Sequence, residues 1–272
     1  MLLVSLDKPR QDWLGMRRSK LRQKLDAGGV ARVCALGANL PYYPAFAAAA
    51  GYDAVWVDGE HRPWNPREIA DFAARHHLAD IDLLFRPPTT EKTGLSRLLE
   101  DGVTALMIPQ VNTAAEAARL AQAVKFPPFG ERGVDGSGPD GGFWLERTPD
   151  YPAQRNRETL LIVQIETPAA IPELGAIAAV PGVDALLFGP GDFSLRAGGE
   201  ASIRNPAVRR AVETMAAACQ AAGKPWGFPV GNLEDAKTVI DLGCRILAMG
   251  NEFWAIHDHL KQCGRQLDEL LG

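Results

Sequence analysis

Short apolar runs recur along the chain, and they predict buried strands. The runs are Arg32–Leu36, Ala54–Asp58, Ile81–Arg86, Thr104–Pro109, Leu160–Glu166, Asp184–Gly189, Pro225–Val230 and Cys244–Gly250. Most are rich in Val, Ile, Leu and Phe, too short for helices, and not strictly alternating between apolar and polar residues. This pattern is typical of parallel strands that are buried on both faces.

Helical patterns fill the intervals between these runs. Asn65-Pro66 opens one helix with a cap and a first-turn proline, and Thr113–Val124 repeats alanine at helical spacing. Strand and helix alternate eight times, which predicts an α/β fold of the (β/α)8 TIM-barrel class. The alternative, an open doubly wound sheet, would carry a GxGxxG turn after an early strand, and no early run is followed by one.

Three segments fall outside the alternation. We expect residues 1–17 to be an N-terminal leader and residues 18–272 to form a single barrel domain, whose bottom is closed by a helix with a solvated Arg17-Arg18-Ser19-Lys20 face. Lys125–Thr159 reads as a long loop with a glycine-rich stretch at 133–142, and loops of this length are usually functional or disordered. Asn251–Leu271 is an amphipathic C-terminal helix that could pack on its own barrel or on a neighbour.

Composition narrows the class of protein. The chain has 272 residues, 46% hydrophobic and 23% charged, with a net charge of -4, so it has no global basic surface for nucleic acid. No apolar run approaches about 20 residues, and the N-terminus lacks the features of a signal peptide, so we expect a cytoplasmic protein without membrane contact. The four cysteines are far apart and predict free thiols, and His76-His77 lies on a polar helix where we expect it to be solvated.

Five chemically active side chains follow the ends of predicted strands. They are Asp58, His61, Arg86, Glu166 and Asp192. In a TIM barrel all such positions lie at one face. Two carboxylates suit a divalent cation such as Mg²⁺ or Mn²⁺, an arginine can neutralise a developing oxyanion, and a histidine oriented by an aspartate suits proton transfer.

Each of these residues also has a purely structural interpretation. Glu166 could pair with Arg86, Asp192 could be a turn residue or an N-cap, and His61 could be an ordinary loop histidine. Their joint placement at one barrel end favours the functional interpretation.

The motifs that contain these residues resemble a known family. They are Gly51-Tyr52-Asp53, Asp58-Gly59-Glu60-His61, Phe85-Arg86-Pro87, Leu106-Met107-Ile108-Pro109-Gln110-Val111, Pro127-Pro128-Phe129-Gly130-Glu131-Arg132-Gly133, Val163-Gln164-Ile165-Glu166-Thr167 and Phe188-Gly189-Pro190-Gly191-Asp192-Phe193-Ser194. In this order they resemble the HpcH/HpaI family of metal-dependent class II pyruvate aldolases, which act on substrates such as 4-hydroxy-2-oxoheptanedioate and 2-dehydro-3-deoxyglucarate.

The resemblance implies reversible aldol cleavage of a 4-hydroxy-2-oxo acid to pyruvate and an aldehyde through a metal-stabilised pyruvate enolate. Glu166 and Asp192 would hold the cation, which would be Mg²⁺ or Mn²⁺, with Co²⁺ as a further option. Arg86 would stabilise the enolate, and His61 paired with Asp58 would carry the proton. The small-molecule keto acid would meet Gln164 and the backbone of Gly189, Pro190 and Gly191. The resemblance also implies a homo-oligomer, a hexamer with an exchanged C-terminal helix and active sites at subunit interfaces.

The chain departs from the family pattern at three places. Gly191 stands where the family usually has alanine, and Glu100 stands where an aspartate often reaches a neighbouring subunit's substrate site. The loop after Gly133 diverges and carries Phe143 and Trp144, and we expect it to shape the choice of aldehyde.

Two alternative functions remain open. One is a related enolate lyase, either an oxaloacetate decarboxylase or a CoA-thioester lyase. The other is a barrel that binds a keto acid without turnover.

Overall fold

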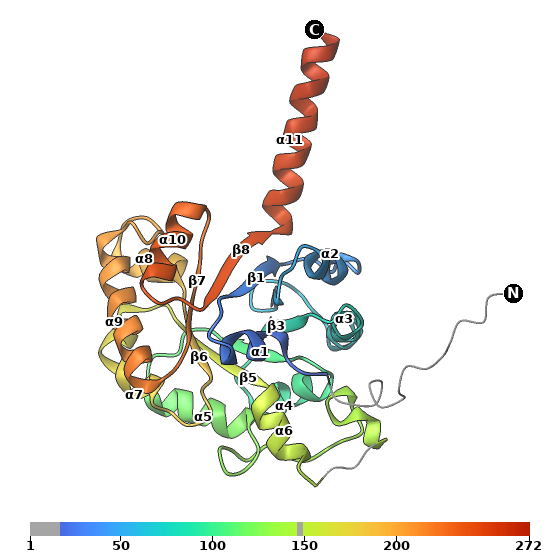
Figure 1. The fold of residues 1–272 in the computed structure, drawn as a ribbon, viewed down its shortest axis with the longest axis vertical. Helices are drawn as coiled ribbons and strands as arrows, with labels where there is room; N and C mark the ends of the chain where they lie inside the picture. Colours follow the sequence, from blue (N-terminus) through green and yellow to red (C-terminus); the bar gives the residue numbers. More distant parts are fainter. Residues whose placement is uncertain (1–16, 146–148) are drawn as a thin grey trace, which may run out of the picture.

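Eight parallel strands close into a barrel in chain order (Figure 1). The computed structural model describes residues 17–145 and 149–272. The strands are β1 (Ala31–Leu36), β2 (Ala54–Asp58), β3 (Asp82–Arg86), β4 (Ala105–Ile108), β5 (Leu160–Ile165), β6 (Ala185–Phe188), β7 (Trp226–Pro229) and β8 (Ile246–Asn251). They coincide with the eight predicted runs to within two residues at each end, and the predicted (β/α)8 barrel is therefore confirmed.

The chain also forms helices, most of which cover the outside of the barrel. They are α1 (Lys20–Asp26), α2 (Tyr43–Ala49), α3 (Pro66–Leu78), α4 (Lys92–Glu100), α5 (Ala114–Val124), α6 (Tyr151–Glu158), α7 (Leu174–Ala178), α8 (Pro190–Ala197), α9 (Pro206–Ala222), α10 (Leu233–Asp241) and α11 (Glu252–Leu271), with 3₁₀ turns η2 (Pro139–Trp144) and η3 (Pro168–Glu173). Asn65 caps α3 as predicted, Asn65 and Thr113 each form a capping box, and Gly223 ends α9 with a left-handed φ of 65°.

The buried apolar side chains form an inner and an outer layer. The outer layer lies between the strands and the helices, and the inner layer fills the barrel itself. Leu21 of α1 belongs to the inner layer and is fully buried, so the first helix plugs the amino-terminal end of the barrel. We call this end the floor, and we call the end where the strands finish the mouth.

Buried charges reinforce the floor. Asp82, at the start of β3, accepts hydrogen bonds from the Ser19 hydroxyl at 2.5 Å and the Leu21 amide at 2.9 Å, and it pairs with Arg17. The expected solvated face is therefore wrong for Arg17 and Ser19, because Asp82 is fully buried and needs their donors. The rest of the predicted leader lies outside the described residues.

His76 and His77 are also more buried than we expected from the sequence. His76 is 1% exposed and donates from Nδ1 to the Phe72 carbonyl at 2.8 Å. Burial lowers the pKa of His76 to about 4, and it also lowers the pKa of His77. The prediction of a solvated pair was wrong, because α3 packs this part of its surface against the rest of the protein.

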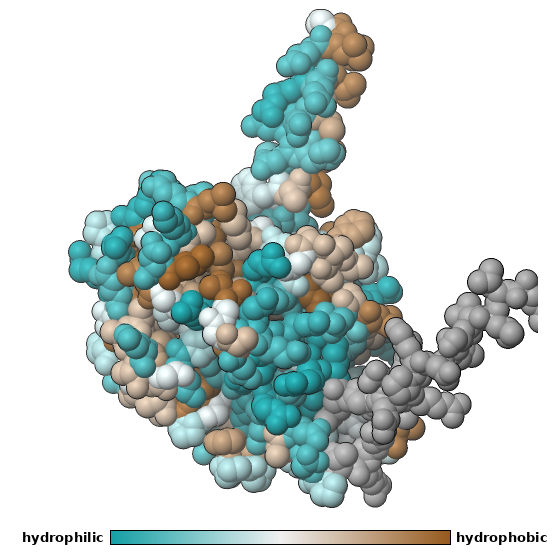
Figure 2. Space-filling view, viewed as in Figure 1, coloured by the Kyte–Doolittle hydropathy of each residue, from teal (hydrophilic) through white to brown (hydrophobic). Residues whose placement is uncertain are grey.

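The C-terminal helix extends away from the barrel (Figure 1). None of the residues of α11 is buried, and the apolar side chains along it remain exposed, including Trp254 at 57% and Leu260 at 64%. Figure 2 shows hydrophobic side chains along one side of this helix. In the described part of the chain, no helix is long and apolar enough to cross a membrane.

Candidate active site

Strand alternation determines which side chains reach the mouth of the barrel. Ala54, Leu84, Ile162 and Leu187 belong to the inner layer. Because side chains on one face of a strand recur every second residue, the same face ends at Trp56, Asp58, Arg86, Gln164, Glu166 and Gly189. The structure therefore brings most of the predicted site residues together.

Arg86 is held on three sides. Its Nε donates to Asp58 Oδ1 at 2.9 Å, its Nη1 lies 3.2 Å from Glu60 Oε2, and its guanidinium carbon lies 5.1 Å from the ring centroid of Trp56. Asp58 and Arg86 are register partners on β2 and β3. Burial alone would raise the pKa of Asp58, but the hydrogen bond and charge of Arg86 outweigh it and lower that pKa. The arginine therefore presents a fixed, charged donor at the mouth.

His61 differs from its predicted arrangement. Its ring is 55% exposed, and Nε2 lies 3.6 Å from Glu60 Oε2. Asp58 Oδ1 accepts hydrogen bonds from the backbone amides of Glu60 and His61, in addition to the bond from Arg86. The predicted pairing of the Asp58 carboxylate with the His61 imidazole is therefore wrong in this structure. The Asp58 carboxylate accepts hydrogen bonds from the turn that follows it and from Arg86 on the neighbouring strand. The Glu60 carboxylate lies beside the His61 imidazole instead.

Glu166 is the most buried carboxylate at the mouth, at 1% exposure. Oε1 accepts from the Gln110 amide at 2.9 Å, and Oε2 accepts from Gln164 Nε2 at 2.6 Å. Burial, followed by the negative charge of Asp192, raises the pKa of Glu166 to about 7, although the Gln110 amide opposes the shift. Such a group binds either a proton or a cation near neutral pH.

Asp192 lies in the first turn of α8, immediately above β6. Its Oδ1 accepts from Arg196 Nη1 at 3.0 Å, and both side chains are more than a third exposed. Gly189 precedes this helix, and a Cβ there would lie 2.6 Å from Glu166 Oε2. A Cβ on Gly191 would meet nothing within 4 Å. The backbone at Gly189 is therefore packed directly against Glu166, whereas Gly191 has room.

The donor set at the mouth fits a hard divalent cation. Asp192 raises the pKa of Glu166, and a positive ion between the two carboxylates would relieve this repulsion. Gln164 Oε1 is buried without a hydrogen-bond partner among the described residues. The described residues contain no group of three or more His, Cys, Asp or Glu side chains arranged as a complete metal cage. A cation here would need further oxygen ligands from substrate or water.

Two predicted contributors lie at the opposite end of the barrel. Glu100 ends α4, and residues 125–145 follow α5, so both come between a helix and the start of the next strand and lie at the floor. They contact each other, since a Cβ on Gly138 would lie 2.4 Å from the Glu100 carbonyl oxygen. Glu100, Phe143 and Trp144 therefore lie away from the mouth of their own barrel, and the expectations that Glu100 reaches a neighbouring subunit's substrate site and that the loop shapes the choice of aldehyde stay predictions.

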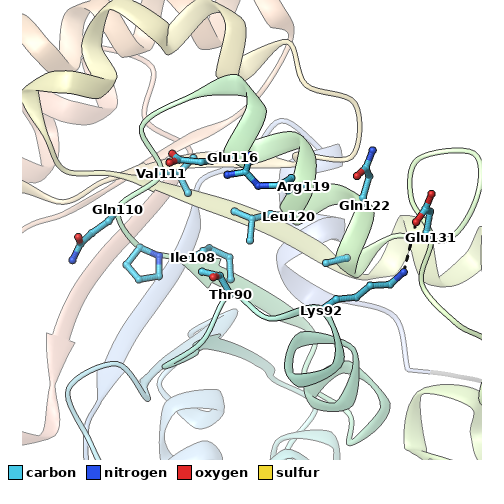
Figure 3. A pocket seen from close by; sticks show the side chains of 12 residues that line it. Thr90, Lys92, Ile108, Gln110, Val111, Glu116, Arg119, Leu120, Gln122 and Glu131 are labelled. Atoms are coloured by element: carbon cyan, nitrogen blue, oxygen red, sulfur yellow. Dashed lines mark ion pairs between the residues drawn. The ribbon is translucent and has the colours of Figure 1, made fainter.

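Two adjoining cavities open beside the mouth. A recess of about 400 Å³ is lined by Glu60, Pro87, Pro88, Thr89, Thr90 and Pro109. A second cavity of about 520 Å³ lies between α4 and α5 and shares Thr90 and Pro109 with it. Figure 3 shows the second cavity, in which Lys92 points away from Thr90 toward Glu131.

Glu60 and Gln110 are site residues that the sequence did not identify. Glu60 was visible inside the Asp58-Gly59-Glu60-His61 turn, but nothing in the sequence showed that it contacts both Arg86 and His61. Gln110 adopts a left-handed φ of 56°, which directs its amide to Glu166. Strand-end position was the signal for both residues.

Comparison with known proteins shows which family the chain belongs to. The family model described as HpcH/HpaI aldolase/citrate lyase matches residues 33–257. The chain is 36% identical over 215 residues to a hydroxypyruvate/pyruvate aldolase of Delftia acidovorans, covering 79% of each chain. It is 31% identical to a 2-keto-3-deoxy-L-rhamnonate aldolase of Escherichia coli K12, covering 89% of this chain and 90% of the relative. The crystal structure of an HpcH/HpaI aldolase from Desulfitobacterium hafniense superposes with a TM-score of 0.86 at 29% identity, over 92% of this chain and 96% of that one. The chain therefore belongs to the HpcH/HpaI aldolase/citrate lyase family and is a carbon–carbon lyase.

Proposed function

We propose that the protein cleaves a 4-hydroxy-2-oxo acid reversibly to pyruvate and an aldehyde, with a divalent cation held by Glu166 and Asp192. The observation that carries this proposal is the buried Glu166, whose pKa is raised to about 7 beside Asp192 and close to a fixed arginine. The names of the two relatives support it, because one is an aldolase of hydroxypyruvate and pyruvate and the other an aldolase of 2-keto-3-deoxy-L-rhamnonate.

The residues of this chain would divide the chemistry as follows. When bound, the cation would polarise the oxygens of the keto acid and draw electrons toward them. Amides at the start of α8 would bind the substrate carboxylate, because a helix N-terminus favours an anion. Arg86 would donate to the C2 oxygen as negative charge develops on it.

Proton transfer completes the reaction. In cleavage, a base takes the proton of the C4 hydroxyl, the C3–C4 bond breaks, and its electron pair forms the enolate of pyruvate. A proton then adds to C3 to give the methyl group. His61 would handle these protons, since its ring is exposed and Glu60 faces it at 3.6 Å.

The direct test is proton exchange of pyruvate in D₂O, followed by NMR. We expect the methyl signal to disappear with Mg²⁺, Mn²⁺ or Co²⁺ present, and to persist in EDTA. Arg86→Ala and Glu166→Ala should abolish exchange, whereas Arg67→Ala, at an exposed position on α3, is the matched control. A folded wild-type protein that exchanges no protons with any of these metals would refute the proposal. Oxaloacetate decarboxylation passes through the same enolate and stays a prediction.

We also propose a homo-oligomer, for which the sequence resemblance indicated a hexamer with an exchanged C-terminal helix. The support is α11, a 20-residue helix whose apolar residues find no cover on their own barrel. Replacing exposed Leu260 and Leu267 with glutamate should reduce the particle mass measured by light scattering. Lys261→Glu and Gln266→Glu, on the same helix, serve as charge-adding controls. An unchanged mass in the leucine variants would refute the role of α11.

A further inference from the structure

The start of the C-terminal helix is attached to the mouth of the barrel. Glu252 is the first residue of α11, which continues directly from β8, and β8 pairs with β1 (Figure 1). Glu252 Oε1 accepts hydrogen bonds from the amides of Gly37 at 2.7 Å and Ala38 at 3.1 Å. Both amides follow the last residue of β1. A carboxylate from a distant part of the sequence therefore holds the loop after this strand, and hydrogen bonds to a charged acceptor are stronger than those between neutral groups.

The same loop contacts the turn that carries His61. A Cβ on Gly37 would lie 3.0 Å from Arg62 Nε and 3.2 Å from Glu252 Oε1, so the side chains of Arg62 and Glu252 both pack against this glycine. Arg62 Nη1 in turn donates to the His61 carbonyl oxygen at 3.0 Å. A continuous set of contacts therefore runs from α11 through the loop after β1 to the turn after β2.

The position of the His61 imidazole depends on the backbone of its turn. The ring is 55% exposed, and its Nε2 lies 3.6 Å from Glu60 Oε2, which is too long for a hydrogen bond. Asp58 holds the turn through the His61 amide at 3.4 Å, and Arg62 holds it through the carbonyl oxygen. Because a displacement of about 1 Å at a reacting group can cost about 100-fold in rate, these backbone contacts bear on the chemistry.

We propose that Glu252 is a positioning residue for the aldol reaction. It holds the loop after β1, this loop supports Arg62, and Arg62 fixes the backbone of His61 at the mouth. The proposal rests on the proposed function, in which His61 handles the protons, and it adds a residue of the C-terminal helix to those that shape the site. Glu252 acts without touching the substrate, and its contribution reaches the reacting atoms through His61.

The kinetics of pyruvate proton exchange distinguish positioning from a general loss of structure. Glu252→Ala removes both hydrogen bonds and should lower kcat by about tenfold, while the KM for pyruvate stays within about twofold because Arg86 and Glu166 are untouched. Glu252→Gln keeps an acceptor oxygen and should restore kcat to within about threefold of the wild type. Glu269→Ala is the matched control, since it removes the same charge near the far end of α11, and it should leave kcat within about twofold.

A double-mutant cycle tests whether the effect passes through Arg62. Arg62→Ala alone should also lower kcat by about tenfold. If the two residues act through one set of contacts, the double variant Glu252→Ala/Arg62→Ala should lie within about threefold of either single variant. Two independent residues would instead multiply their effects to about 100-fold, and this result would overturn the proposed connection between α11 and His61.

The wild-type protein separates failure of this proposal from failure of the proposed function. If the wild type exchanges pyruvate protons and Glu252→Ala does so with the same kcat, Glu252 is not a positioning residue, and the proposed function stands. If Glu252→Ala raises the pyruvate KM as much as it lowers kcat, its role is structural and the proposal is again wrong. If the wild type exchanges no protons with Mg²⁺, Mn²⁺ or Co²⁺, the proposed function fails, and this proposal fails with it.

Discussion

Removing the charge of Glu166 should stabilise the metal-free protein at alkaline pH. The ordinary pKa of a glutamate is 4.5, and that of Glu166 is raised to about 7. The folded protein therefore holds a proton that the unfolded chain releases, so this group stabilises the fold below pH 4.5 and the contribution is lost as pH rises through about 7. At about 1.4 kcal/mol per pKa unit, the loss between pH 5 and pH 8 amounts to about 2 to 3 kcal/mol.

Glu166→Gln keeps the shape of the side chain and cannot ionise. In EDTA, the difference in unfolding free energy between this variant and the wild type should shift by about 2 to 3 kcal/mol in favour of glutamine from pH 5 to pH 8. Urea unfolding followed by circular dichroism measures it. Glu173→Gln, at an exposed position on η3, is the control and should show no such shift.

The unfolding free energies of the wild type and Glu166→Gln have to be compared with each other at each pH. The titration of His76 also changes the stability with pH, in the opposite direction to that of Glu166. Burial lowers the pKa of His76 to about 4, so it opposes folding as pH falls from 6.5 toward 4. This contribution is common to wild type and Glu166→Gln and cancels in their difference.

Parallel stability curves from pH 5 to pH 8 would refute the reasoning, because they would show that Glu166 is neither desolvated nor repelled by Asp192. An excess of Mn²⁺ should instead stabilise the wild type more at pH 8 than at pH 6.

Three further outcomes follow from the geometry of the mouth and the core. Gly189→Ala should lower metal-dependent pyruvate exchange by at least about tenfold, because its Cβ would lie 2.6 Å from Glu166 Oε2. Gly191→Ala has room for its Cβ and should alter the free energy of unfolding by less than about 0.5 kcal/mol. Asp58→Asn should reduce kcat on the order of tenfold with a smaller change in the pyruvate KM, because Arg86 loses the carboxylate that orients it. His76→Gln should remove part of the loss of stability between pH 6.5 and pH 4, which urea unfolding would measure. If the variant loses as much stability as the wild type over this pH range, His76 is solvated.

The barrel was predictable from the sequence because parallel strands buried on both faces leave a simple signal. Each strand is a short apolar run, and Asn65 and Thr113 are strong local helix starts. The position of Arg86 and Glu166 at one face followed from the same pattern, since strand ends in a barrel share one rim.

Side-chain partners were less predictable, since they depend on distances across strands. Asp58 and His61 are close in sequence. The register of β2 and β3 nevertheless places Asp58 next to Arg86, and His61 lies beside Glu60. The burial of His76 depended on packing around α3, which its polar neighbours in the sequence do not reveal. The loop after α5 could have been assigned to the floor from chain order alone, because the chain that leaves the mouth after β4 has to return to the start of the parallel strand β5.

The closed floor has a consequence for redesign of the enzyme. Asp82, held by Ser19 and Leu21, secures the end of the barrel that is remote from Glu166. Thr90, in contrast, is exposed and belongs to no buried cluster. Directed evolution of residues at the mouth can therefore explore new substrates while the opposite end retains the fold.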